Sequence, residues 1–316
     1  MSPQFPPSRP EEPNSAGSSA YVLMTSAFNE EDYIEKTIQS VISQTVRPAA
    51  WVIVSDGSTD RTDSICGQYA RAYDFIHCIR VEHSNGESLP RIGAVAHRKV
   101  NALARALGLL SSTPYAYIGN IDGDVTIDRT FFEDLTQHFD DEQDLGIGGG
   151  FIYNVVEGNN VPAFVNPRNV GGALQFFRAA CFRDIGGYVP WGHEDSIALI
   201  AARMKGWATK SFPDLKVYHH KTANWAGLRR CKSKYRLGML DYVMSDSVPW
   251  VALRCLKELG ETPPVVGSLA RFVGYLVGSV RERKVLAPDA QRYVRNEQYR
   301  TLKNALSSRL RRRPAA

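Results

Sequence analysis

Residues 21–60 read YVLMTSAFNEEDYIEKTIQSVISQTVRPAAWVIVSDGSTD: an apolar run, a polar turn and a helical stretch, then a second apolar run and a second polar turn. The runs Tyr21–Ala27 and Trp51–Ser55 are almost unbroken, which is typical of parallel strands covered on both faces. The stretch between them, Glu30–Ser43, has the pattern of an amphipathic helix. The segment therefore predicts a strand–helix–strand unit of an α/β sheet.

The same alternation continues beyond residue 60. Further strands are expected at Phe75–Val81 and Tyr115–Ile121, and further helices at Thr62–Tyr73 and Ala94–Leu110. A mostly parallel, doubly wound sheet of this kind binds ligands beyond the carboxyl ends of its strands. Three polar turns fall at such ends, and we expect them to line one site: Ser26–Glu31, Asp56–Asp60 and Asp122–Asp124.

Length and composition indicate how the rest of the chain is organised. The 316 residues, 43% hydrophobic and 22% charged, allow one large α/β domain plus an appendage. Residues 1–19 are rich in Pro and Ser and are expected to be a disordered leader rather than a signal peptide. We expect the α/β domain at 20–226 and a basic helical extension at 227–316. Within the α/β domain, the Pro- and Asn-rich stretch Glu157–Val170 is expected to be a loop. The five cysteines form no CxxC pair, which fits a reducing compartment better than a zinc site or a disulfide framework.

The two parts differ in charge. There are 19 Lys plus Arg against 26 Asp plus Glu up to Ala226, and 19 against 7 from Gly227 onward. In the basic part, Leu269–Val280 is apolar but too short to span a bilayer, and Arg281 follows it directly. Such a helix suits the interface of an anionic membrane, and packing on the α/β domain is an equally weighted alternative. Nucleic-acid binding is not expected, because the basic run lacks interleaved aromatic residues.

The strongest chemical signal is Asp122-Gly123-Asp124, directly after the expected strand ending at Ile121. Two carboxylates separated by a glycine can both reach a hard cation such as Mg²⁺ or Mn²⁺, and the glycine lets a phosphate approach closely. The metal would neutralise the charge that builds on a departing nucleoside diphosphate. A solvated turn is the alternative, which the position at a strand end disfavours.

The turn Ser55–Asp60, SDGSTD, is the second polar cluster. Asp56 is expected to accept hydrogen bonds from a nucleobase or ribose, with a plain strand-to-helix turn as the alternative. Asp60 is expected only to cap the helix that follows it, and Asn29 is expected to cap the helix after the first turn.

SAFNEE at 26–31, SDGSTD at 55–60 and DGD at 122–124, in this order and spacing, resemble glycosyltransferase family 2. The resemblance covers about Tyr21 to His220. It implies a GT-A fold (a Rossmann-like α/β sheet), an inverting mechanism and a UDP-, GDP- or dTDP-sugar donor. It also implies roles for matching residues: Ala27, Asn29 and Glu30 for the nucleotide pocket, Asp56 for the base, and Asp122 and Asp124 for ribose, diphosphate and metal.

A third cluster, Gly192-His193-Glu194-Asp195, opens an expected helix at Asp195–Lys205. An inverting transfer needs one base to take the proton of the attacking hydroxyl. The dipole at a helix N-terminus favours the ionised form of a carboxylate. The resemblance assigns Asp195 as this base, beside Glu194, and the alternative is that both acids only stabilise the first helical turn.

Supporting positions follow from the same resemblance. It places Lys99 facing the phosphates, His219 rather than His220 on metal or diphosphate, and Gly172 on the acceptor side. Trp191 lies beside the expected base and is suited to stack on an acceptor sugar. An exposed helix face for Lys99 and ordinary packing for Trp191 are the alternatives.

Together with the resemblance, which implies inversion, the sequence predicts a metal-dependent glycosyltransferase that is peripheral on the cytoplasmic face of the cell membrane. The resemblance implies a saccharide acceptor, which in family members with a similar basic tail is commonly lipid-linked and belongs to an envelope or exopolysaccharide pathway. A sugar-1-phosphate nucleotidyltransferase is an alternative, disfavoured because Ser26–Glu31 is acidic rather than Gly-rich and basic. A catalytically silent membrane-bound scaffold is a second alternative. It is disfavoured because the four acids expected to bind the donor or act as the base are all present: Asp56, Asp122, Asp124 and Asp195.

Overall fold

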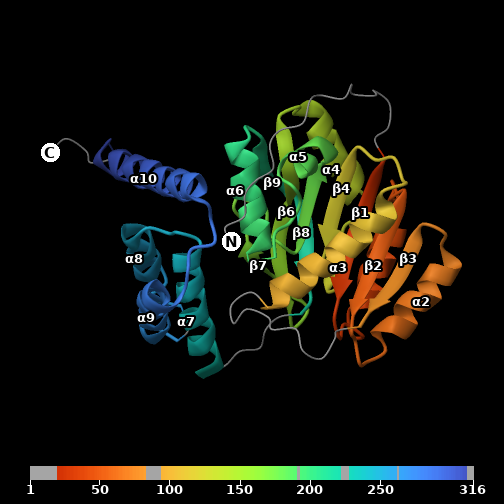
Figure 1. The fold of residues 1–316 in the computed structure, drawn as a ribbon, viewed down its shortest axis with the longest axis horizontal. Coiled ribbons are helices and arrows are strands. Elements are labelled where there is room, and N and C mark those ends of the chain that lie inside the picture. Colours follow the sequence, from red (N-terminus) through yellow and green to blue (C-terminus); the bar gives the residue numbers. More distant parts are fainter. Residues whose placement is uncertain (1–19, 83–93, 191–192, 222–227, 262, 312–316) are drawn as a thin grey trace. The chain divides into compact units, whose positions relative to one another are not determined.

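The computed structural model describes residues 20–311 apart from 83–93, 191–192, 222–227 and 262. The described residues fall into two compact units, one within 5–222 and one within 223–316 (Figure 1). The leader expected at residues 1–19 lies outside the described residues.

Within the described residues, the first unit is built on a nine-stranded mixed sheet of order β3-β2-β1-β4-β8-β6-β9-β5, with β7 paired to β6. One half is parallel throughout. It consists of β1 (Tyr21–Ala27), β2 (Ala50–Asp56), β3 (Ile76–Val81) and β4 (Tyr117–Ile121). The carboxyl ends of these four strands therefore share one edge of the sheet.

The other half of the sheet is mixed. It contains β5 (Val125–Ile127), β6 (Leu145–Val156), β7 (Asn159–Phe164), β8 (Leu174–Arg178) and β9 (Ala208–His219). β8 is antiparallel to β4 and to β6, whereas β6 and β9 are parallel. The α/β class predicted from the sequence is confirmed, and the parallel arrangement holds for the first half of the sheet.

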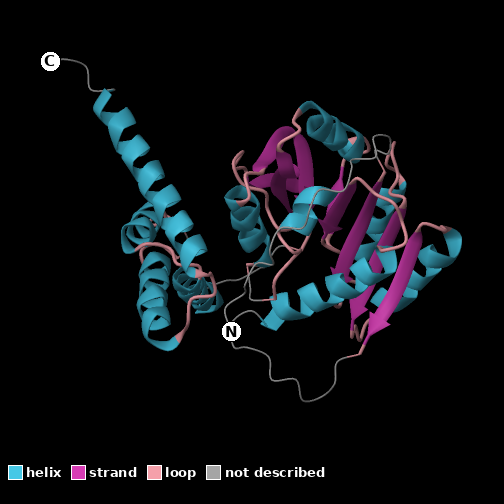
Figure 2. Ribbon diagram, turned by 45° about the horizontal axis from the view of Figure 1, so that its top comes forward, coloured by secondary structure: helices cyan, strands magenta, loops and turns pink. Residues whose placement is uncertain are grey.

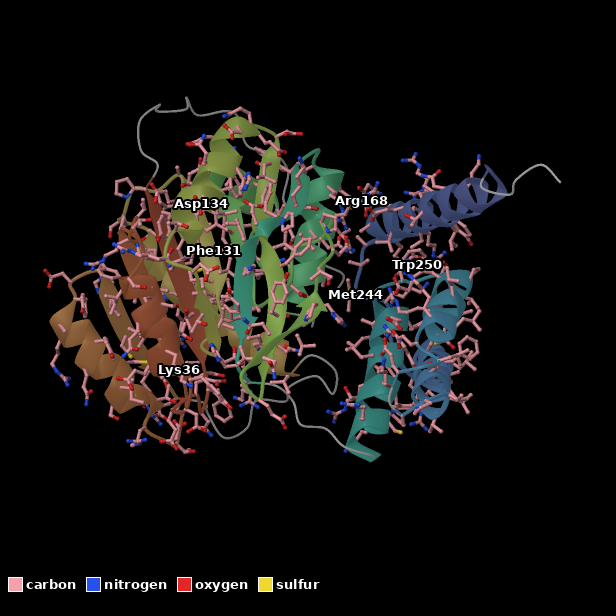
Figure 3. All side chains as sticks on the ribbon, turned by 180° about the vertical axis from the view of Figure 1, so that it is seen from behind. Lys36, Phe131, Asp134, Arg168, Met244 and Trp250 are labelled. Atoms are coloured by element: carbon pink, nitrogen blue, oxygen red, sulfur yellow. The ribbon has the colours of Figure 1, made fainter. Side chains whose placement is uncertain are left out.

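Helices cover both faces of the sheet (Figure 2). They are α1 (Ile34–Ile42), α2 (Thr62–Ala72), α3 (Ala94–Leu110), α4 (Phe131–Asp141), α5 (Ala179–Asp184) and α6 (Glu194–Met204). Alternate residues of β1 enter two separate cores: Leu23 packs in the core of α1, α2 and α4, and Met24 in that of α3, α5 and α6. Phe131 and Asp134, labelled in Figure 3, mark the buried and exposed faces of α4. Burial on both sides explains why the β1 run is apolar throughout.

Two predicted elements differ from the structure. The helix expected from Glu30 begins at Ile34, and Asn29 does not cap it. Asn29 is left-handed, with φ 53°, and its side chain bonds to the second turn instead. The stretch Glu157–Val170, expected to be a loop, contains β7, which pairs with β6. β6 is the one partner of β7 in the described sheet, so β7 is an edge strand, where polar residues and proline are tolerated. Its polar sequence therefore gave no strand signal.

The second unit is helical. Its helices are α7 (Leu228–Val243), α8 (Val248–Lys257), α9 (Val266–Arg281) and α10 (Pro288–Arg311). α7 and α9 cross closely: a Cβ on Gly238 would lie 1.8 Å from the Arg271 carbonyl oxygen, and one on Gly274 2.0 Å from that of Tyr235. Only glycine permits this contact. Across the described parts of the chain, no helix is long and apolar enough to cross a membrane.

Candidate functional site

Hydrogen bonds lock the first two polar turns together at the carboxyl ends of β1 and β2. The Asn29 backbone N–H donates to Ser58 Oγ at 3.2 Å, and Asn29 Oδ1 accepts from the Thr59 N–H at 2.8 Å. The Glu31 N–H donates to Asp60 Oδ2 at 3.0 Å. The two turns therefore form one surface, as their shared sheet edge predicted.

Asp60 has a wider role than the cap expected of it. Its Oδ1 accepts from the Thr62 N–H at 3.0 Å, at the start of α2, while its Oδ2 holds the first turn. Burial alone would raise the pKa of Asp60, but hydrogen bonds from Thr62 and from the Glu31 backbone outweigh it and lower the pKa. Asp56, at the end of β2, is 5% exposed, and its role with the nucleobase stays a prediction.

The third turn, Asp122-Gly123-Asp124, packs directly on the first. A Cβ on Gly123 would lie 3.4 Å from Glu30 Cγ and 3.7 Å from Ala27 Cβ. The Thr37 hydroxyl of α1 donates to the Gly123 carbonyl at 2.9 Å. All three predicted turns thus meet at one edge, with Ala27 beneath the glycine.

Lys99 of α3 lies between two groups of carboxylates. Its Nζ is 2.6 Å from Asp122 Oδ1 and 3.8 Å from Glu194 Oε1. Burial alone would lower the pKa of Lys99, but Asp122 and Glu194 outweigh it and raise the pKa. Burial raises the pKa of Asp122 and of Glu194, and Lys99 offsets only part of that shift. Lys99 therefore neutralises the acidic cluster, and contact with phosphates stays a prediction.

His219 of β9 faces the second carboxylate of the motif. Its Nε2 is 3.1 Å from Asp124 Oδ2, and its Nδ1 is 3.3 Å from Asn154 Oδ1. The hydrogen bond to Asp124 raises the pKa of His219, and burial opposes the shift. His220 instead contacts Thr126 Oγ1, at 2.8 Å.

The Asp124–His219 pair fits a divalent cation. Adjacent ligands of an octahedral cation with bonds of about 2.1 Å lie about 3.0 Å apart, close to the spacing observed here. A bond from Nδ1–H to Asn154 would leave Nε2 free for a metal. Within the described ranges, no three His, Cys, Asp or Glu side chains form a metal-binding group, and Asp122 is turned to Lys99. Asp124 and His219 are thus the two side chains placed as candidate ligands, and cation binding by them stays a prediction.

The acidic pair Glu194 and Asp195 forms the first turn of α6. His193, just before it, is left-handed with φ 55°, a conformation uncommon for a non-glycine residue. The Ser196 N–H donates to Asp195 Oδ1 at 2.7 Å. A Cβ on Gly172 would lie 2.7 Å from Asp195 Oδ2, so a larger residue at this position would displace the carboxylate.

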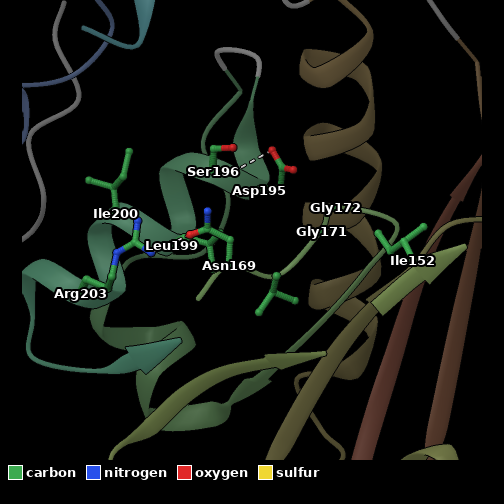
Figure 4. Close-up of a pocket in the computed structure, with 10 residues that line it drawn as sticks. Ile152, Asn169, Gly171, Gly172, Asp195, Ser196, Leu199, Ile200 and Arg203 are labelled. Atoms are coloured by element: carbon green, nitrogen blue, oxygen red, sulfur yellow. Dashed lines mark hydrogen bonds between the residues drawn. The ribbon is translucent and has the colours of Figure 1, made fainter. Parts of the chain in front are cut away.

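A pocket of about 300 Å³ opens beside Asp195 (Figure 4). Gly172 and Ser196 lie at it with Asp195, and Leu199 and Ile200 of α6 supply an apolar side. A ligand in this pocket would reach the Asp195 carboxylate. Trp191, expected beside it, lies outside the described residues.

Two side chains that were not predicted from the sequence, one buried and one partly buried, support the start of α6. Gln175 of β8 is fully buried, and its Nε2 donates to the carbonyl oxygens of Val170 and Asp195 at 3.2 and 3.3 Å. The Tyr188 hydroxyl donates to Gln175 Oε1 at 2.8 Å. The available signal was a glutamine inside an apolar strand, because buried amides need partners.

The chain belongs to glycosyltransferase family 2. Residues 23–183, slightly more than half of the chain, match the family model "Glycosyl transferase family 2". A putative teichuronic acid biosynthesis glycosyltransferase, TuaG, of Bacillus subtilis (strain 168) is 35% identical over 102 residues, 32% of this chain and 34% of the relative. An uncharacterized glycosyltransferase of the same organism, EpsJ, is 27% identical over 129 residues, 41% of this chain and 33% of the relative. The alignments thus span about a third of these relatives.

Solved structures confirm the GT-A fold. The mannosyltransferase PcManGT from Pyrobaculum calidifontis, in complex with GDP-Man and Mn²⁺, superposes with a TM-score of 0.55 at 14% identity, covering 95% of this chain and 83% of that one. GalNAc-T7, with UDP, GalNAc and Mn²⁺, gives a TM-score of 0.53 at 14% identity, covering 86% and 56%. At these identities the likeness concerns the fold alone.

Proposed function

We propose that the chain is an inverting, metal-dependent glycosyltransferase that moves a sugar from a nucleotide-sugar donor to a saccharide acceptor. Residues 20–226 would form the catalytic domain. The observation that carries the proposal is the meeting of three turns at one sheet edge, with the Asp124–His219 pair and Lys99 beside them. Two GT-A neighbours crystallised with Mn²⁺ and a nucleotide or nucleotide sugar support it.

The donor would bind across the three turns. Asn29, Glu30 and Asp56 would hold the nucleoside above Ala27, and Asp122 would reach the ribose and diphosphate. Asp124 and His219 would hold Mg²⁺ or Mn²⁺. The cation supplies positive charge next to the leaving diphosphate.

Asp195 would act as the base. An acceptor hydroxyl in the neighbouring pocket gives its proton to the Asp195 carboxylate, while its oxygen forms a bond to the anomeric carbon. The bond from that carbon to the diphosphate breaks on the opposite face, which inverts the configuration. The hydrogen bond from the Ser196 N–H would keep this carboxylate oriented. Glu194 would position Lys99, and Gly172 and Trp191 would border the acceptor.

A panel of donors tests this proposal. UDP-, GDP- and dTDP-sugars, with and without MnCl₂, are added to the protein while its melting temperature is recorded. One donor is expected to raise the melting temperature in a manganese-dependent way. Asp124→Ala should abolish that shift, and Asp134→Ala, an exposed acid on α4, should keep it. If no donor stabilises the wild-type protein with manganese, the proposal is wrong.

The second unit would bind the cytoplasmic face of an anionic membrane, where a lipid-linked acceptor of envelope or exopolysaccharide synthesis is found. α9 exposes an apolar stripe of Val266, Leu269, Val273, Leu276 and Val280, which are 41–85% exposed. Its spacing of three and four residues keeps the stripe on one face of the helix. The excess of 19 basic over 7 acidic residues from Gly227 onward complements anionic lipid.

Vesicle sedimentation tests the membrane proposal. The wild-type chain should pellet with vesicles of phosphatidylcholine and phosphatidylglycerol, and less with phosphatidylcholine alone. Leu269→Asp combined with Leu276→Asp should leave it in the supernatant, because both side chains lie on the exposed stripe. Leu109→Asp, an exposed leucine of α3, is the matched control. Continued pelleting of the double variant would reject the stripe as the docking face.

A further inference from the structure

An ion pair joins the end of β9 to the first turn. Lys221 Nζ lies 2.7 Å from Glu30 Oε1, although the two residues are 191 positions apart in the chain. The Lys221 side chain is 46% exposed and that of Glu30 only 13%. The pair thus presents an accessible ammonium group held by a largely buried carboxylate.

The position of this pair relates it to the proposed donor site. Glu30 packs on the Asp122-Gly123-Asp124 turn, where its Cγ lies 3.4 Å from the place of a Cβ on Gly123. Lys221 follows His219 by two residues. The ammonium group therefore lies where the nucleotide turn and the proposed cation ligands meet, which is the place a diphosphate would occupy.

The two lysines of the site differ in availability. Lys99 is 18% exposed and lies between Asp122 and Glu194. In the part of the chain that the structure describes, Lys221 Nζ contacts one carboxylate oxygen. An ammonium group has three donors, so this contact leaves two for a ligand. The other oxygen of this carboxylate, Glu30 Oε2, is buried and has no hydrogen-bond partner among the described residues. No other described side chain therefore competes with Lys221 for a hydrogen bond to Glu30.

We infer that Lys221 binds the diphosphate of the donor and that Glu30 is a positioning residue that holds its ammonium group toward the site. This inference rests on the proposed function. An ammonium group binds phosphate oxygens as a compact point charge, in addition to the cation at Asp124 and His219. Because Glu30 takes one donor of three, Lys221 can bind phosphate without leaving it.

Nucleotide titration tests the inference. UDP, GDP and dTDP are titrated calorimetrically with MnCl₂ present, and the matching nucleoside is followed by ligand-detected NMR. Lys221→Met should weaken the binding of the diphosphate about tenfold to a hundredfold, the range expected for one charged hydrogen-bond partner, and leave the nucleoside unchanged. Lys221→Arg should restore most of the affinity. Glu30→Gln should weaken binding less than Lys221→Met, because the lysine remains.

Lys216→Met is the matched control, since Lys216 is an exposed lysine of β9, the strand that ends two residues before Lys221. The inference is overturned if Lys221→Met binds the diphosphate within twofold of wild type, or loses the nucleoside equally. A wild-type protein that binds none of the three diphosphates would instead remove the proposed function itself.

Discussion

Buried carboxylates occur in both units of the molecule, but they are compensated differently. In the helical unit, Asp241 accepts from Arg271 Nε at 2.8 Å and from Arg254 at 2.6 Å. Glu258 pairs with Arg271 at 2.6 Å and with Lys234 at 2.7 Å. Burial alone would raise the pKa of Glu258, but these cations outweigh it and lower the pKa.

At the sheet edge of the first unit the balance is reversed. Burial raises the pKa of Glu30, Asp122 and Glu194, although each has a lysine close by. A raised pKa means that the folded protein disfavours the ionised form of the carboxylate. A bound cation would stabilise that ionised form. The ion pairs of Glu258 therefore stabilise the fold, whereas the three acids at the sheet edge are expected to gain from a bound cation. Asp246 of the helical unit is an exception there, because burial raises its pKa despite the nearby Arg254.

Removing the proposed base should give the largest effect. Asp195→Asn keeps the size of the side chain but cannot take a proton, so sugar transfer should fall by a factor of about 10²–10⁴. Donor affinity should stay within twofold, because the base lies on the acceptor side. Transfer is measured with the donor that the panel selects. Transfer at the normal rate by Asp195→Asn would show that this carboxylate is not the base.

Breaking the ion network of the helical unit should cost stability rather than donor binding. Arg271→Ala leaves Asp241 and Glu258 with fewer partners, so the free energy of unfolding should fall by about 3–5 kcal/mol if the unit unfolds with the rest. The measurement is denaturant unfolding followed by circular dichroism. If Arg271→Ala kept its stability but lost donor binding, the acids of the helical unit would serve the ligand rather than the fold.

Asp60 offers a test inside the first unit, because this acid is satisfied there. Asp60→Ala removes its bonds to the Thr62 and Glu31 N–H groups and should cost about 1 kcal/mol at pH 7. Its lowered pKa means that this contribution is present above the ordinary value of 3.8 and is lost as the pH falls through the folded-state value.

The difference between wild type and Asp60→Ala should therefore shrink in unfolding measurements below about pH 4. Asp74→Ala, an exposed acid after α2, is the control and should show little difference at either pH. A difference that grows on acidification would contradict the assignment.

The smallest effect is expected at the exposed end of the ion network. Glu261 contacts Lys234 at 2.7 Å, but its side chain is 58% exposed. Glu261→Gln should change the free energy of unfolding by less than about 1 kcal/mol, because exposed ion pairs contribute little. A loss comparable to that of Arg271→Ala would show that burial does not set the contribution of these pairs.

The parallel half of the sheet was predictable because each of its elements carries its own local signal. Tyr21–Ala27 and Ala94–Leu110 have the same bounds in prediction and structure. In the mixed half, β6 contains Gly148–Gly150. Glycine occupies these positions because residues distant in the sequence pack against the backbone there. A Cβ on Gly149, for example, would lie 2.5 Å from Val170. Such contacts between distant residues leave no local pattern.

The site shows the same division. The acidic turns were predictable because each follows an apolar strand. The bond from the Thr59 N–H to Asn29 was not, since a residue of this type at a turn is expected to cap the nearest helix. The pairing of Lys221 with Glu30 was not predictable either, because the two residues are 191 positions apart. Glu30 belongs to the first polar turn, but no motif includes Lys221.

The binding of Mn²⁺ itself tests the central claim most directly. Electron paramagnetic resonance follows free Mn²⁺ as the protein is added together with UDP, GDP or dTDP. We expect wild type and Glu261→Gln to remove Mn²⁺ from solution equally in the presence of one of the diphosphates, and Asp124→Asn to remove almost none. Equal binding by Asp124→Asn, or no binding by wild type with any of the three, would contradict a cation site at the edge where the three turns meet.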